Sequence, residues 1–157
     1  MKKIHAYVAG PLFTRAEIDL RYAIEETMKK ALKSKELKGK IDFDIFNPIH
    51  LNEELEQNGK LTPQEIFKND LAAIQKSKLT ILDIDNKDDG TMAEFGYFLA
   101  MKERDPEVKI CVWMSDFRDV ADRDIRLNRF INGMIYVSDG CVKNQQELYD
   151  WLIKAYK

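Results

Sequence analysis

The sequence LTILDI, residues 79–84, decides the fold that this chain is expected to adopt. Apolar side chains occupy four of its six positions, without the strict alternation of a half-solvated strand. Such a segment is typical of a strand buried on both faces, in a parallel sheet covered by helices. Because parallel strands are joined by helical crossovers, the sequence on either side should alternate between strands and helices.

That alternation extends along the whole chain. The other β-prone segments are short, and they lie at residues 4–9, 43–46, 108–114 and 134–137. Apolar residues at helical spacing predict helices at residues 14–32, 62–76, 91–103 and 144–156. Residues 52–60 show no strong period and are expected to form a loop or a short irregular helix. This order predicts one α/β domain over residues 1–157, with a doubly wound, mostly parallel five-stranded sheet and helices on both faces.

The charge balance narrows the function classes. The 157 residues include 25 basic and 27 acidic side chains, for a formal net charge of -2, so a nucleic-acid polymer is not an expected partner. No apolar run reaches membrane-spanning length and no signal peptide precedes the first strand, so we expect a soluble, cytoplasmic protein without a membrane partner. Cys111 and Cys141 form no CxxC pair, which suits a reducing compartment and provides no motif for thiol catalysis.

Ligands of an open α/β sheet bind outside the carboxyl ends of its strands. This rule selects four loops, at residues 10–13, 47–50, 85–94 and 115–122. The third loop is the most unusual, because it packs four acidic residues and Gly90 around the start of a helix. The charged segment from Arg118 to Arg126 either gates the cleft or lines a subunit contact, and the sequence does not choose between these roles.

Glu94 is the first candidate for chemistry. Thr91 is a suitable N-cap, which would place Glu94 in the first turn, where the helix dipole and free amide groups favour an ionised carboxylate. A carboxylate held there can attack the anomeric carbon of a sugar. The alternative is structural, with Glu94 completing a capping box with Thr91. Gly96 lowers the helix propensity of this segment, which indicates close packing against a strand or another chain.

Asp70 is the second candidate. It lies mid-helix beside apolar residues, where a buried, partnered carboxyl would be a candidate acid with a perturbed pKa. The alternative is an exposed carboxylate that pairs with a nearby lysine. Other chemistries lack their motifs, since the sequence has neither GxGxxG nor a Gly-Lys-Ser/Thr triplet. His5 and His50 are the only histidines and neither has a paired ligand at suitable spacing, so no metal is expected.

Three motifs, in order, resemble the nucleoside 2-deoxyribosyltransferases. They are YVAGPLF at residues 7–13, NDL at residues 69–71 and DDGTMAEFGY at residues 88–97, and INGMI at residues 131–135 looks like a fourth. The ordered combination covers most of the chain and is more specific than any single motif. The resemblance implies a flavodoxin-like fold and the transfer of 2-deoxyribose between purine or pyrimidine bases through a covalent deoxyribosyl-enzyme intermediate.

The resemblance also implies catalytic roles for three residues. Glu94 matches the family's nucleophile, and Asp70 matches the acidic residue that helps proton transfer to and from the nucleobase. Tyr7 matches a tyrosine whose hydroxyl positions the nucleophile. Two carboxyl groups, one as nucleophile and one as acid and then base, are what glycoside chemistry with retention commonly uses. No metal or redox cofactor is expected for this reaction.

Other matching residues are expected to bind the substrate, which would be a small deoxynucleoside or a free nucleobase. Asp88 matches a carboxylate that binds sugar hydroxyls, and Phe13 matches an aromatic wall of the base pocket. Gly10 and Gly90 are expected to let the backbone approach the ligand.

The resemblance further implies shared active sites. Asn132 matches an asparagine that a neighbouring subunit lends to the 5′ end of the sugar, with Asn128, one helical turn away, as the alternative. The expected assembly is a homo-oligomer, either a dimer or a trimer of dimers.

Two competing functions stay open at this point. One is a hydrolase of the same fold that cleaves 2′-deoxynucleoside 5′-monophosphates, for which Thr14 and Arg15 could supply phosphate contacts. Asp88 and Asp89, close to the sugar, would repel that phosphate. The other is a non-catalytic module that senses nucleotides, which would have no use for a nucleophile.

Overall fold

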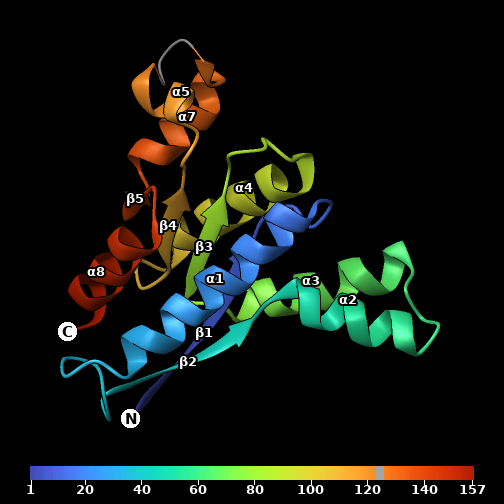
Figure 1. Ribbon diagram of the computed structural model, residues 1–157, viewed down its shortest axis with the longest axis horizontal. Helices are drawn as coiled ribbons and strands as arrows, with labels where there is room; N and C mark the ends of the chain where they lie inside the picture. Colours follow the sequence, from blue (N-terminus) through green and yellow to red (C-terminus); the bar gives the residue numbers. More distant parts are fainter. Residues whose placement is uncertain (123–125) are drawn as a thin grey trace.

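A computed structural model describes residues 1–122 and 126–157 and contains a five-stranded sheet (Figure 1). The strands are β1 (Lys2–Ala9), β2 (Ile41–Phe46), β3 (Leu79–Asp83), β4 (Lys109–Trp113) and β5 (Gly140–Val142). Every pairing is parallel, and the strand order is β2-β1-β3-β4-β5. This order is that of a flavodoxin-like doubly wound sheet, and it confirms the predicted fold class.

Helices connect the strands and cover both faces of the sheet. They are α1 (Arg15–Leu32), α2 (Pro48–Gln57), α3 (Pro63–Lys76), α4 (Asp89–Arg104), α5 (Phe117–Ala121), α7 (Arg129–Tyr136) and α8 (Gln145–Tyr156). The predicted start of α3 is confirmed, because the Thr62 side chain accepts a hydrogen bond from the Glu65 amide and Pro63 occupies the first turn. None of the helices in the described residues is long and apolar enough to span a membrane.

The core divides into two clusters, one on each face. Ala6 and Val8 of β1 point to the cluster that contains α1 and α8, whereas Tyr7 and Ala9 point to the cluster that contains α3, α4 and α7. This division follows from the alternation of side chains along a strand. In Figure 1, α1 crosses in front of the strands. Residues 79–83 of β3 are buried on both faces, as their composition predicts.

One predicted element is wrong, and a second is more regular than expected. Residues 134–137 were expected to form a strand, but α7 runs to Tyr136 and the fifth strand is Gly140–Val142. A short apolar run fits either state, and here the Asn128 side chain caps a helix by accepting from the amides of Phe130 and Ile131. Residues 52–60 were expected to form a loop or a short irregular helix, and residues 52–57 belong to the regular helix α2, which begins at Pro48 after the N-cap Asn47.

Candidate active site

The strand order places a switch point between β1 and β3, where the crossovers leave for opposite faces of the sheet. A cavity of about 480 Å³ lies on one side of this point, between α3 and α4. Most of its lining is apolar and comes from α3, including Ile66, Phe67 and Leu71. Asp70 from α3 and Glu94 from α4 are the carboxyl groups that line it. The cavity therefore has apolar walls and two acids.

Tyr7 fixes the position of the Glu94 carboxyl group. The Tyr7 hydroxyl donates a hydrogen bond to Glu94 Oε1 at 2.6 Å. Tyr7 is buried at the end of β1, and its ring stacks on Phe46 with ring centroids 5.5 Å apart. Burial and the charge of Glu94 raise the pKa of Tyr7 well above its ordinary value, so the hydroxyl remains a donor. This arrangement matches the positioning role that the resemblance implies for Tyr7.

The environment of Glu94 differs from the sequence-based expectation. Helix α4 begins at Asp89, with Asp88 as the N-cap, so Glu94 lies in the second turn rather than the first. Asp88 Oδ2 accepts hydrogen bonds from the amide and the hydroxyl of Thr91, at 2.7 and 2.9 Å. Thr91 is therefore not the N-cap, and the capping box between Thr91 and Glu94 does not form. The carboxyl group of Glu94 therefore does not cap the helix, and Glu94 lines the cavity.

The predicted ionisation of Glu94 is also corrected. Burial raises its pKa to about 7, and the negative charges of Asp70 and Asp88 act in the same direction. The hydrogen bond from Tyr7 and the positive charge of Arg21 act against this rise. The helix dipole cannot compensate here, because its effect falls off within the first turn.

Asp70 faces the same cavity from α3. It is partly buried, and burial raises its pKa to about 6. Its Oδ1 atom is buried and accepts no hydrogen bond from the residues that the structure describes, so the predicted alternative of a surface pair with lysine is not observed. A buried acceptor of this kind can take a hydrogen bond from a ligand or from an ordered water molecule.

Arg21 and Asp83 form a buried ion pair that the sequence analysis missed. Arg21 reaches from α1 to the strand ends, where Nη1 donates to the Ala9 carbonyl at 2.6 Å and Nη2 to Asp83 Oδ2 at 2.5 Å. Gly10 lies against it with φ of +154°, and a Cβ atom there would come within 1.4 Å of Arg21 Nη1. The available signal was Asp83 itself, since a carboxylate inside an apolar strand requires a partner.

The acidic loop after β3 is largely structural. Asp85 accepts hydrogen bonds from the Ser115 amide at 2.6 Å, the Ser115 hydroxyl at 2.5 Å and the Asp116 amide at 2.9 Å. Its own amide donates to Asp83 Oδ1 at 3.0 Å. These bonds join the loops that follow β3 and β4. Lys87, in the left-handed region with φ of 51°, forms an ion pair with the buried Asp119.

Other predicted site residues are distributed differently. Gly90 is part of the cavity lining. Phe13 does not, because its side chain is 79% exposed in the loop before α1. Asn132 is buried on α7 and is not part of this lining. Residues 123–125 of the predicted charged segment lie outside the described residues, and the part before them contains α5.

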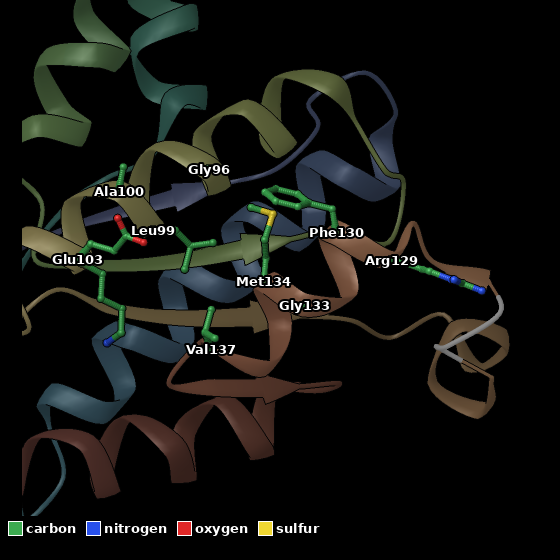
Figure 2. A pocket seen from close by; sticks show the side chains of 10 residues that line it. Gly96, Leu99, Ala100, Glu103, Arg129, Phe130, Gly133, Met134 and Val137 are labelled. Carbon is green, nitrogen blue, oxygen red and sulfur yellow. The ribbon is translucent and has the colours of Figure 1, made fainter.

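A second cavity, of about 780 Å³, lies between α4 and α7 (Figure 2). Its lining is mainly apolar and includes Leu99, Phe130, Met134 and Val137. Gly96, expected to pack closely against a strand or another chain, faces open space within this chain. Within the described part of the chain, the prediction of packing against a strand is therefore wrong.

The sequence profile described as nucleoside 2-deoxyribosyltransferase matches residues 6–150. The chain belongs to this family. A protein of Ureaplasma parvum serovar 3, described as uncharacterized, is 42% identical over 135 residues, which are 85% of this chain and 84% of that protein.

Two solved structures share the fold. A conserved protein of Enterococcus faecalis V583 superimposes with a TM-score of 0.70 and 18% identity, over 98% of both chains. A 2-deoxyribosyltransferase of Bacillus psychrosaccharolyticus superimposes with a TM-score of 0.62 and 15% identity, over 95% of this chain and 91% of that one. Together with the profile match, these structures confirm the resemblance drawn from the sequence motifs and the α/β fold that it implies.

Proposed function

We propose that this protein moves 2-deoxyribose between purine and pyrimidine bases, through an ester of the sugar with Glu94. The observation that carries the proposal is the hydrogen bond from Tyr7 to Glu94 at the edge of a cavity that Asp70 also lines. A carboxylate held by a tyrosine, with a second carboxyl group of raised pKa in the same cavity, is the pair that glycoside chemistry requires.

The reaction has two displacements. In the first, a Glu94 carboxylate oxygen forms a bond to C1′ while the N-glycosidic bond breaks, and Asp70 gives its proton to the departing base. In the second, a nitrogen of the incoming base attacks C1′, its proton passes to the Asp70 carboxylate, and Glu94 leaves as a carboxylate. Each displacement inverts C1′, so the product retains the configuration of the substrate.

This mechanism requires Glu94 to be ionised while Asp70 is protonated. The pKa values of about 7 for Glu94 and about 6 for Asp70 have the opposite order, so the reactive form is a minor species of the free enzyme. The rate should therefore follow a bell-shaped pH profile with its maximum between about pH 6 and pH 7. The two apparent values belong to the carboxyl pair rather than to either residue alone.

Substitution of the two acids tests the proposal. Glu94→Ala should lower base exchange by roughly a thousandfold or more, and mass spectrometry should find the deoxyribosyl adduct on the wild type and not on this variant. Asp70→Asn should slow exchange less completely and remove one limb of the pH profile. Circular dichroism establishes that each variant is folded. Glu54→Ala, at an exposed position of α2, serves as the matched control. Exchange by Glu94→Ala near the wild-type rate would exclude the mechanism.

The first loop favours nucleosides over nucleoside monophosphates. The amides of Phe13 and Thr14, which could bind a phosphate, both donate to Glu17 Oε2, at 2.9 and 2.6 Å. Arg15 is paired with Asp19 at 2.9 Å on the exposed face of α1. A carboxylate therefore already occupies the donors that the competing 5′-monophosphate hydrolase would use. Incubation with dAMP, or with deoxyinosine and free adenine, separates the two functions by their products.

We further propose that a second copy of this chain covers the cavity between α4 and α7 (Figure 2). Phe130 and Val137 are exposed large apolar residues on this surface, and Phe130 is 76% exposed. Gly96 and Gly133 present open space there, which allows close approach of another chain. Asn132, the residue expected to serve a neighbouring site, lies on the same helix. These features support a homo-oligomer with shared active sites.

A further inference from the structure

Arg21 carries a charge that is costly to bury. Its side chain is fully buried, and among the described residues Nε has no hydrogen-bond acceptor. A buried ion pair is often no more stabilising than apolar residues of similar volume, because both charges lose their hydration. The pair with Asp83 is therefore weak evidence for a purely stabilising role, and its place in the fold indicates what else it does.

Arg21 holds the strand that presents Tyr7. Its guanidinium bonds the carbonyl of Ala9, two residues after Tyr7 on β1, and the carboxylate of Asp83 at the end of β3. It reaches this position from α1, on the face of the sheet opposite α4 and Glu94. Gly10 leaves it room, because any side chain there would overlap the guanidinium. Arg21 thus joins the two strands at the switch point, from the face of the sheet opposite α4.

Arg21 also offsets the negative charge around Glu94. Asp70 and Asp88 both raise the pKa of Glu94, whereas the Arg21 charge lowers it. A guanidinium stays protonated throughout the working pH range, so this contribution does not itself titrate. Because Asp83 neutralises part of that charge, the strength of the effect depends on both members of the pair.

We propose that Arg21 is a positioning residue for the nucleophile, which fixes the ends of β1 and β3 behind Glu94 and supplies the positive charge that counters its acidic neighbours. The description of Glu94 as the nucleophile rests on the proposed function, but the effect of the Arg21 charge on Glu94 does not. Arg21 is buried against Gly10 and does not line the cavity that Asp70 and Glu94 share. It acts through Glu94.

The charges of the pair can be removed one at a time, with opposite expected effects. Arg21→Met removes the positive charge and should move the titration midpoint of Glu94 to higher pH, by roughly half a pH unit or more. Asp83→Asn removes the negative charge, keeps an acceptor for Arg21, and should move the midpoint to lower pH. A purely structural pair would not give shifts of opposite sign. Arg104→Met, at the exposed far end of α4, is the matched control and should leave the midpoint in place.

Carbon-13 NMR of the glutamate side-chain carboxyl groups measures this midpoint without any substrate. The Glu94 resonance is the one that disappears in Glu94→Gln. Unchanged midpoints, or shifts in the same direction, in folded Arg21→Met and Asp83→Asn would overturn the proposal. If one variant fails to fold, the direction of the other decides. If neither folds, the pair is required for stability and the positioning role is rejected.

The same variants separate this inference from the proposed function. Should the midpoints shift as expected while the wild type transfers no deoxyribose, the electrostatic role of Arg21 stands and the reaction is wrong. Should the wild type transfer deoxyribose, the basic limb of its pH profile should follow the NMR midpoint in Arg21→Met and Asp83→Asn, because the pKa of Glu94 lies above that of Asp70 and the higher apparent value sets that limb. A limb that stays in place while the midpoint shifts would separate Arg21 from catalysis.

Discussion

Replacing Glu94 with glutamine should stabilise the protein, and the gain should grow with pH. Burial raises the pKa of Glu94 from its ordinary value of 4.5 to about 7 in the folded state. Below pH 4 the carboxyl group is protonated in both the folded and the unfolded chain, so it contributes no pH dependence. As the pH rises past 4.5 the unfolded chain releases its proton first, and unfolding becomes more favourable until the folded group also ionises near pH 7.

The size of this effect follows from the two values. One pH unit corresponds to about 1.36 kcal/mol, so a rise from 4.5 to about 7 costs the wild type about 3 kcal/mol of unfolding free energy at pH 8. Glutamine has a similar shape, keeps an oxygen acceptor for the Tyr7 hydroxyl and carries no charge. Glu94→Gln should therefore exceed the wild type by about 3 kcal/mol at pH 8 and by close to nothing at pH 4.

Urea denaturation at a series of pH values between 4 and 8 measures this difference. At pH 8 the variant should also melt roughly 6 to 12 °C above the wild type, given the usual relation between stability and Tm for a chain of this size. Glu54→Gln on α2 removes an exposed carboxylate and controls for the loss of one charge. A gap between Glu94→Gln and the wild type that is the same at pH 4 and pH 8 would refute the reasoning, because only a titrating group produces a pH-dependent gap.

Three other substitutions test separate parts of the structure. Tyr7→Phe removes the donor that stabilises ionised Glu94, so the basic limb of base exchange should move to higher pH and kcat/KM at pH 6 should fall roughly tenfold, as steady-state kinetics will show. Gly10→Ala places a methyl group against a buried guanidinium and should lower the unfolding free energy by about 2 kcal/mol or more in urea, with an unchanged value as the contrary result. Phe130→Glu places a charge on the exposed apolar surface of α7 and should give monomers in light scattering together with loss of exchange, so an intact oligomer would remove this surface from the interface.

Local patterns were sufficient to predict most of the fold. The apolar run of β3 and the helical spacing after Thr14, Thr62 and Asn144 predicted elements that the structure contains, because each pattern is set by side chains close in sequence. The strand predicted at residues 134–137 was wrong because it too was based only on side chains close in sequence. A run of four apolar or aromatic residues is too short to show either the helical or the strand period. The N-cap that favours the helix, Asn128, lies outside this run.

The site was harder to predict, because its electrostatics depend on contacts between distant residues. The sequence motifs assigned Tyr7, Asp70 and Glu94 to one site. In the structure, Tyr7 and Glu94 form a hydrogen bond although they are 87 residues apart in the sequence. The protonation of Glu94 could not be anticipated from its place in the helix, since burial decides it. Asp88 and Thr91 are both good capping residues, and only the backbone geometry shows that Asp88 is the cap.

The two carboxyl groups that line the cavity are held by different structural elements. Glu94, on α4, is tied to the sheet by its hydrogen bond from Tyr7, whereas Asp70 shares α3 with most of the apolar side chains that line the cavity, including Ile66, Phe67 and Leu71. Most of the lining therefore comes from one helix, and the carboxyl group proposed as the nucleophile comes from another. Under the proposed function, substitutions confined to α3 should change which bases are accepted, while Glu94 keeps its hydrogen bond from Tyr7.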